Sequence, residues 1–142
     1  MSRTHISVTL RRQIIDRAKQ CCEYCRIGMN DGAIDFAIDH IIAEKHGGKT
    51  LESNLCLSCF WCNSYKGSDI SSVDWAFDES IVPLFNPRKQ NWHDHFRIDG
   101  TRIISLSPEG RVTVFLLRLN AVERIKERKL LIQLKLYPCD KK

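Results

Sequence analysis

Apolar positions in the first part of the chain repeat with two different periods. Between residues 10 and 18 they follow helical spacing, and Thr9 is a suitable N-cap, so a helix is predicted from there to about Cys21. The apolar stretch FAIDHII then predicts a strand over residues 36–40 that ends near His40. A helix followed by a short strand is therefore expected before the middle of the chain.

A second short strand and a helix are predicted after a polar loop. The loop EKHGGKTLESN carries Gly47 and Gly48 and separates the first strand from an apolar segment at residues 55–57. A helix is expected to begin at about Cys62. This part of the chain therefore has the order strand, loop, strand, helix.

The remaining sequence predicts a hairpin and two helices after an irregular segment at residues 70–95. Asp99-Gly100 is the pair that a type I′ turn prefers, and Ser107-Pro108 supplies a cap and an N1 proline for a helix. AVERIKERKLLIQLKL, residues 121–136, predicts a last amphipathic helix. The residues expected to pack are Leu119, Val122, Ile125, Leu130 and Leu134, and those expected on a solvated basic face are Arg124, Lys126, Arg128 and Lys129. The fold class expected from these elements is α+β.

Length and charge limit the class of protein. The chain has 142 residues and contains no apolar run long enough to cross a membrane. Its N-terminal stretch MSRTHISVTLRRQ lacks the apolar core of a secretory signal, so a cytoplasmic location is expected. Residues 1–83 hold 9 Lys/Arg against 11 Asp/Glu, whereas residues 84–142 hold 13 against 6. The second segment therefore carries the basic character that attracts a polyanion.

Seven cysteines are many for a chain in a reducing compartment, where clustered cysteines more often bind metal than form disulfides. Cys22-x2-Cys25 and Cys59-x2-Cys62 are two CxxC knuckles, and each knuckle can present two thiolates on one side of a tight bend. Four such ligands complete a tetrahedral shell, so a structural zinc site is predicted.

The exact ligand set stays open at this point. Cys21 adjoins Cys22, and Cys56 forms a further CxxC with Cys59. Cys56 follows an apolar residue of the second strand, which favours Cys59 with Cys62 as the second pair. Cys139 is far along the chain and is expected to be a lone free thiol.

Several short motifs between and after the knuckles resemble those of the HNH nuclease family. They are Asp39-His40, Gly47-Gly48, Asn54-Leu55 and Cys62-Asn63-x2-Lys66. The resemblance covers roughly residues 20–68 and implies the ββα-metal fold, here in the HNN variant with zinc-binding CxxC pairs. Residues 1–83 are expected to form the HNH core with its zinc knuckles, and residues 84–142 a basic hairpin and helical extension that packs on this core, in one compact domain overall.

The resemblance implies a role for each motif residue. His40 would be the general base that takes a proton from water, a task that suits the imidazole of a histidine. Asp39 and Asn63 would hold Mg²⁺ or another divalent ion at the scissile phosphate, and Asn54 would brace the loop and orient the base. Lys66, one turn after Asn63, would meet a phosphate near the ion.

DNA is the partner that this resemblance implies, with no membrane and a monomer or weak homodimer. Arg88 and Lys89 are the first candidates for phosphate contacts, followed by Arg97, Arg102 and Arg111. The function expected is therefore a metal-dependent endonuclease that hydrolyses DNA phosphodiesters. The rival expectation is a non-catalytic zinc-knuckle module that binds nucleic acid, which would need the cysteines and basic residues but not the set of Asp39, His40 and Asn63.

Overall fold

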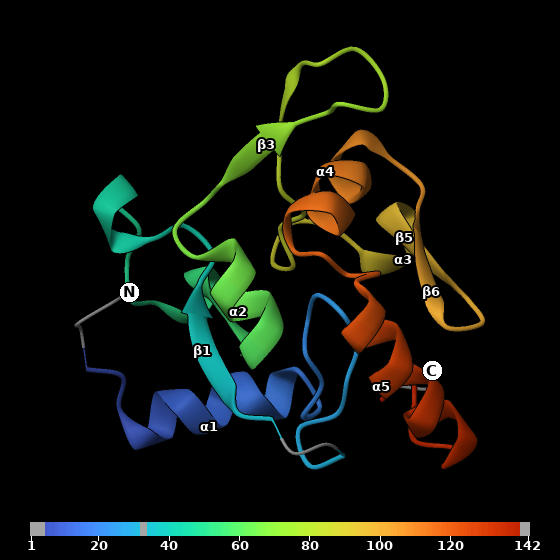
Figure 1. The fold of residues 1–142 in the computed structure, drawn as a ribbon. Helices are drawn as coiled ribbons and strands as arrows, with labels where there is room; N and C mark the ends of the chain where they lie inside the picture. The colour runs from blue at the N-terminus through green and yellow to red at the C-terminus, as the bar shows by residue number, and fades with distance from the viewer. Residues whose placement is uncertain (1–4, 32–33, 140–142) are drawn as a thin grey trace.

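The structure is a computed structural model that describes residues 5–31 and 34–139 (Figure 1). In chain order its elements are α1 (Val8–Arg17), β1 (Phe36–His40), η1 (Glu44–His46), η2 (Glu52–Asn54), β2 (Leu55–Cys59), α2 (Phe60–Lys66), β3 (Ser71–Val73), β4 (Ile81–Pro83), α3 (Trp92–His95), β5 (Phe96–Asp99), β6 (Arg102–Ser105), α4 (Pro108–Leu116) and α5 (Val122–Gln133), where η marks a single 3-10 turn. Short helices are thus combined with two-stranded antiparallel sheets, and the predicted α+β class is confirmed.

The β1–β2 pair and α2 form the ββα unit that the sequence predicts. The strands are antiparallel, with Asp39 opposite Cys56 and His40 opposite Leu55. Helix α2 follows β2 without a loop, because the Cys59 side chain at the N-cap accepts a hydrogen bond from the Cys62 amide. In Figure 1 α2 lies beside β1, so the residues of the two elements can meet.

Helix α1 begins and ends earlier than predicted. Ser7, not Thr9, is the N-cap, and its hydroxyl accepts a hydrogen bond from the Leu10 amide. The helix ends at Arg17, and Lys19 and Gln20 adopt positive φ values of 57° and 62° that cannot continue a right-handed helix. This turn directs the chain into the first CxxC knuckle.

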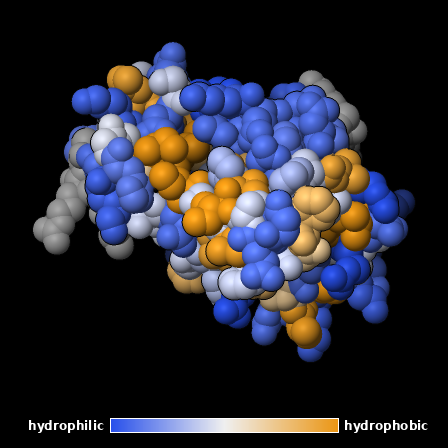
Figure 2. Space-filling view, turned by 90° about the horizontal axis from the view of Figure 1, so that it is seen from above, coloured by the Kyte–Doolittle hydropathy of each residue, from blue (hydrophilic) through white to orange (hydrophobic). Residues whose placement is uncertain are grey.

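The segment expected to be irregular contains a small hairpin, β3–β4, which projects at the top of Figure 1. Its large apolar side chains are exposed: Trp75 by 61%, Phe77 by 75% and Ile81 by 73%. Figure 2 looks down on this side of the molecule and shows apolar patches between hydrophilic ones. The hairpin contributes little to the core beyond Val82, which packs against it. An ion pair between Asp74 and Arg111 also joins the hairpin to α4.

The hairpin predicted around Asp99-Gly100 is present as β5–β6, but its turn differs. Asp99 pairs with Arg102, so the two turn residues are Gly100 and Thr101. Only Gly100 has a positive φ, of 60°, which is the pattern of a type II′ turn and not of the predicted type I′ turn. Asn120 then fixes the hairpin to the start of α5, because its side chain both accepts from the Ile103 amide and donates to the Ile103 carbonyl.

Helix α4 begins as predicted, with Ser107 as N-cap and Pro108 in the first turn. The face assigned to α5 was wrong in part, although Leu119 is buried and Lys126 and Lys129 are exposed as expected. Arg124 and Arg128, expected in solvent, are both only 4% exposed, whereas the supposed packing residues Val122, Leu130 and Leu134 are exposed. The two guanidinium groups face inward because buried carbonyl oxygens and sulfur atoms accept their hydrogen bonds.

One hydrophobic core cluster joins the two segments of the chain. It includes Tyr24 from the first knuckle together with Phe85, Trp92, Leu119 and Tyr137. The indole of Trp92 also donates a 2.8 Å hydrogen bond to the Tyr24 carbonyl. No helix within the described ranges is long and apolar enough to cross a bilayer.

Candidate active site and metal centre

Asp39 and His40 lie at the end of β1, and their side chains have different partners. The Asp39 carboxylate is buried, and its Oδ2 atom is 3.0 Å from Lys66 Nζ and accepts a 3.5 Å hydrogen bond from the Tyr24 hydroxyl. All side-chain contacts that Asp39 makes to the described residues go to Oδ2. The other carboxylate oxygen is therefore the one left for a further ligand.

Lys66 is not the exposed phosphate-binding cation that the sequence suggests. It is only 2% exposed, and its ammonium group donates to the His40 carbonyl at 3.1 Å as well as pairing with Asp39. A lysine in this position ties the C-terminal end of α2 to the end of β1. In this structure the ammonium group pairs with the Asp39 carboxylate and is not exposed to solvent.

Burial raises the pKa of Asp39 above its ordinary value, and the charges of Lys66 and His40 act in the opposite direction. The carboxylate therefore needs a cation beside it to remain ionised in this buried position. Lys66 supplies one positive charge, and a divalent ion would supply more.

The imidazole of His40 is held by the loop between the two strands. Its Nε2 atom lies 2.8 Å from the Thr50 hydroxyl oxygen. When Nε2 carries the proton and donates it to Thr50, Nδ1 has a free lone pair that can accept a proton. The Thr50 hydroxyl can accept from Nε2–H or donate to Nε2, so this contact holds the ring in place without selecting a tautomer. Nothing in the sequence pattern pointed to Thr50.

Asn54 makes three side-chain hydrogen bonds to the backbone of the same loop. Its Oδ1 atom accepts from the Ile42 amide at 2.9 Å, and its Nδ2 atom donates to the carbonyls of Ile42 and Lys49. Gly48 is needed for this close packing, since a Cβ there would lie 1.7 Å from the Ile42 carbonyl oxygen. Asn54 and Gly48 together hold the loop against the end of β1, directly after His40.

Asn63 lies in the first turns of α2, immediately after Cys62, and is half-buried. Its backbone carbonyl accepts from Gly67, but its side-chain amide has no hydrogen-bond partner among the described residues. An amide oxygen in this state is available to a hard cation or to water.

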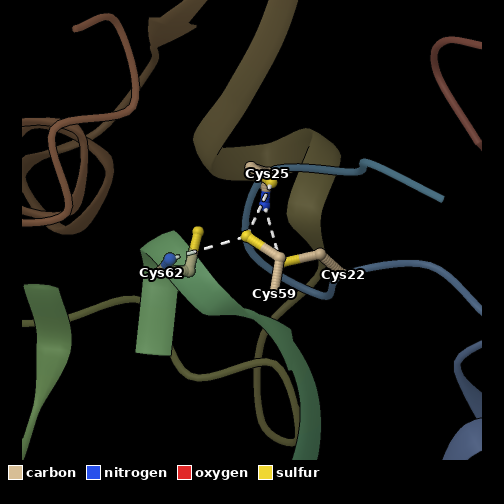
Figure 3. Close-up of side chains that lie close together, drawn as sticks. All are labelled: Cys22, Cys25, Cys59 and Cys62. Atoms are coloured by element: carbon tan, nitrogen blue, oxygen red, sulfur yellow. Dashed lines mark hydrogen bonds between the residues drawn. The ribbon is translucent and has the colours of Figure 1, made fainter. Parts of the chain in front are cut away.

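The four cysteines of the two knuckles converge in the core. Figure 3 shows Cys22 and Cys25 on one turn of the chain and Cys59 and Cys62 on another, with their sulfur atoms directed toward one another. These sulfur atoms all lie within 4.8 Å of each other, and Cys25 Sγ is 3.7 Å from Cys59 Sγ. Four sulfurs bound to one zinc ion at about 2.3 Å would be about 3.8 Å apart. The cluster can therefore hold zinc with little movement.

The other cysteines do not join this cluster. Cys56 is buried on β2, and its thiol lies 3.6 Å from the Tyr24 hydroxyl on the Asp39 side of the sheet. Cys21 forms a disulfide with Cys139 that joins residues 118 positions apart. The expectation that Cys139 is a free thiol was therefore wrong. The chain after α5 returns to the first knuckle, and the backbone amide of Cys139 donates a hydrogen bond to the Arg26 carbonyl there.

A buried arginine from α5 completes the surroundings of the cluster. Arg124 Nη2 lies 3.0 Å from Cys62 Sγ and 3.7 Å from Cys59 Sγ. Burial by itself lowers the pKa of Arg124, but the Cys62, Cys25 and Cys59 thiolates outweigh it and raise the pKa above its ordinary value. Arg124 thus places a positive charge beside the sulfur atoms, which favours the ionised form that binds metal. Hydrogen bonds with the neighbouring cysteines raise the pKa of Cys59, and burial raises the pKa of Cys62, so Arg124 opposes these effects.

The basic residues proposed to contact phosphates differ in availability. The Arg88 guanidinium is mostly buried and pairs with Glu23, and burial lowers its pKa to about 10, with a further decrease from the charge of Arg17. Arg111 is engaged by both carboxylate oxygens of Asp74. Lys89, in contrast, is exposed and lines a pocket of about 280 Å³ whose wall also includes Ile41 and Lys66. Of Arg88 and Lys89, only Lys89 can reach a phosphate in this conformation.

Comparison with protein families assigns the region that contains these residues. Residues 22–69 match the family model of the HNH endonuclease. This region is an HNH domain. The match begins at Cys22 and extends past Lys66, so it contains both knuckles, the Asp39-His40 pair and Asn63. Searches of the curated proteins and of the solved structures gave no significant match. The HNH domain indicates a function on nucleic acid, and its cysteine cluster fits the zinc-binding variant of the family.

Three residues with contacts to the site were missed by sequence reasoning. Thr50 contacts His40, Tyr24 contacts Asp39, and Arg124 contacts the cysteine cluster. Thr50 and Tyr24 lie inside the motif region but follow no periodic pattern. Arg124 lies 62 residues after Cys62, and only the packing of α5 brings it to the sulfur atoms.

Proposed function

We propose that the chain is a metal-dependent HNH endonuclease that hydrolyses DNA phosphodiester bonds, with His40 as the general base. The observation that carries this proposal is the ββα unit itself. It has Asp39 and His40 at the end of β1, an unpaired Asn63 amide on α2, and a loop that holds the imidazole through Thr50. A module that only binds nucleic acid has no need for a carboxylate, an imidazole and an amide in this arrangement.

His40 would act through Nδ1. In the tautomer in which Nε2–H donates to Thr50, Nδ1 can take one proton from a water molecule as the water oxygen attacks phosphorus. The bond from phosphorus to the 3′ oxygen breaks in the same displacement, and the leaving oxygen takes a proton from a second water molecule. Asn54 would keep the loop, and with it Thr50, in the position that this proton transfer requires.

Asp39 and Asn63 would hold the divalent ion through one carboxylate oxygen and one amide oxygen. Mg²⁺ suits such a site, since it usually binds few protein oxygens and keeps waters or substrate phosphate oxygens in its other positions. When bound, the ion supplies charge stabilisation to the phosphate and to the leaving oxygen. Lys66 would orient Asp39 by holding its Oδ2 atom, so that the other oxygen faces the ligand.

The four knuckle cysteines would hold a structural zinc ion. This ion would fix Cys59 and Cys62 at the junction of β2 and α2 and thereby set the position of Asn63, the next residue. Lys89, exposed beside the pocket that reaches Lys66, would contact the DNA backbone.

Relaxation of supercoiled plasmid by the purified chain tests this proposal. We expect nicked circles in the presence of Mg²⁺ and none when EDTA chelates the divalent ions, with the zinc content of the protein measured in both samples. Absence of cutting with several divalent ions and DNA substrates, in protein that retains zinc and binds DNA, would reject the nuclease and leave the binding module.

A further inference from the structure

Arg124 is the only buried cation in the described residues that hydrogen-bonds to the cysteine cluster. Its Nη2 atom donates to Cys62 Sγ at 3.0 Å and lies 3.7 Å from Cys59 Sγ. The residue is 4% exposed, so its charge is compensated inside the protein and not by water. It belongs to α5, far outside residues 22–69.

The guanidinium group is fixed from two sides. Its Nη1 atom donates to the Leu117 carbonyl at 2.7 Å, at the end of α4, while Nη2 faces the sulfur atoms. One turn later, Arg128 bonds the carbonyls of Leu119 and Thr101. Two arginines therefore hold α5 in place, but only the first of them reaches the thiols.

Charge explains why a cation is needed at this position. Four thiolates around one Zn²⁺ ion carry a net charge of −2, and a buried net charge is costly unless it is paired. A guanidinium that donates to two of the sulfurs offsets part of this charge and restricts the rotation of Cys59 and Cys62. Partners of this kind orient the ligands of a metal and tune its affinity.

We propose that Arg124 is a positioning residue of the zinc centre, so that the C-terminal helix α5 is part of the metal site and the HNH region alone is not sufficient for tight zinc binding. This inference rests on the proposed binding of zinc by the four cysteines. It makes the docking of α5 and the retention of zinc depend on each other. Since Asn63 follows Cys62, it also links α5 to the candidate active site.

Release of zinc from the full chain to an excess of a chromogenic chelator tests the inference. We expect Arg124→Gln to release zinc about 10–100-fold faster than the unsubstituted protein, because removing groups that orient metal ligands lowers metal affinity by about this factor. Arg128→Gln is the matched control, since it removes a buried arginine of the same helix that bonds carbonyls and no sulfur. It is expected to release zinc clearly more slowly than Arg124→Gln, because it loosens α5 without removing a contact to sulfur, even though its unfolding midpoint falls.

Arg124→Lys gives a second comparison. Lysine keeps the charge but has a single nitrogen, so it cannot bond the Leu117 carbonyl and the Cys62 sulfur with separate nitrogens. We expect release several-fold faster than in the unsubstituted protein, and this variant decides the question if Arg124→Gln does not fold. Release at the unsubstituted rate in either Arg124 variant, or equally fast release in Arg128→Gln, would overturn the role of Arg124. An unsubstituted chain that purifies without zinc would instead reject the zinc site itself, and this inference with it.

Discussion

Replacing Lys66 by methionine is expected to leave the Asp39 carboxylate buried without its nearest cation. The side chains are 2% and 8% exposed, and Lys66 Nζ is 3.0 Å from Asp39 Oδ2. Methionine has a similar length and fills the same space, so the change removes the charge and the hydrogen bonds without opening a large cavity. The substitution therefore measures how much the ion pair contributes to the fold around the site.

The geometry gives the magnitude. At 3.0 Å and an effective dielectric constant of about 20, the attraction between the two charges is about 5.5 kcal/mol before desolvation is subtracted. Removing one partner of a buried pair typically costs about 3–5 kcal/mol, because the other charge stays buried and unpaired. We expect Lys66→Met to lose free energy of unfolding in this range, and Asp39→Asn to lose about 3 kcal/mol. The double variant should lose much less than the sum, with a coupling energy of at least about 2 kcal/mol.

Urea unfolding followed by circular dichroism, with zinc in excess in every sample, measures these free energies. Lys89→Met is the control, because Lys89 is exposed and its loss should change stability by less than about 0.5 kcal/mol. A coupling energy below about 0.5 kcal/mol would show that Lys66 and Asp39 contribute independently. The positioning role given to Lys66 would then be incorrect.

Three further predictions follow from the contacts of the cysteines and of Lys89. Cys62→Ser should lose zinc and have a lower melting temperature, whereas Cys56→Ser, which is also buried but lies outside the cluster, should keep its full zinc content. Equal zinc loss in both variants would contradict the ligand set. Cys139→Ser should lower the free energy of unfolding by about 2–5 kcal/mol under oxidising conditions, because it opens a loop closed over 118 positions, and the difference from the unsubstituted protein should vanish in dithiothreitol. Lys89→Glu should weaken DNA binding and reduce the slope of log affinity against log salt concentration by about one or more, without changing the unfolding midpoint. An unchanged slope in fluorescence anisotropy titrations would show that Lys89 does not contact DNA.

The sequence predicted those parts of the molecule that depend on local patterns. The strand ending at His40, the second strand from Leu55 and the helix that begins with Ser107 and Pro108 follow from alternation and capping, and all three are present. The two CxxC knuckles were sufficient to predict the cysteine cluster, because a knuckle presents both thiols on one side of a tight bend.

Contacts between distant segments could not be predicted in the same way. Arg124 and Arg128 have helical spacing typical of a solvated basic face, and only the carbonyl oxygens and sulfurs of other segments explain their burial. The Cys21–Cys139 disulfide depends on where the chain goes after α5, and a count of cysteines does not contain that information. The burial of Lys66 depends on how closely α2 packs against β1, which spacing along the helix does not determine.

A comparison of His40→Ala with His46→Ala in the plasmid assay tests the proposed nuclease mechanism most directly. Both histidines lie at or near the loop between β1 and β2, but His40 is buried and bonds Thr50, whereas His46 is exposed and bonds the Ser68 carbonyl. With zinc content and unfolding midpoint matched, we predict that Mg²⁺-dependent nicking falls at least about 100-fold in His40→Ala, the contribution typical of a general base, and changes little in His46→Ala. Nicking that survives in His40→Ala at the unsubstituted rate would contradict the assignment of His40 as the base.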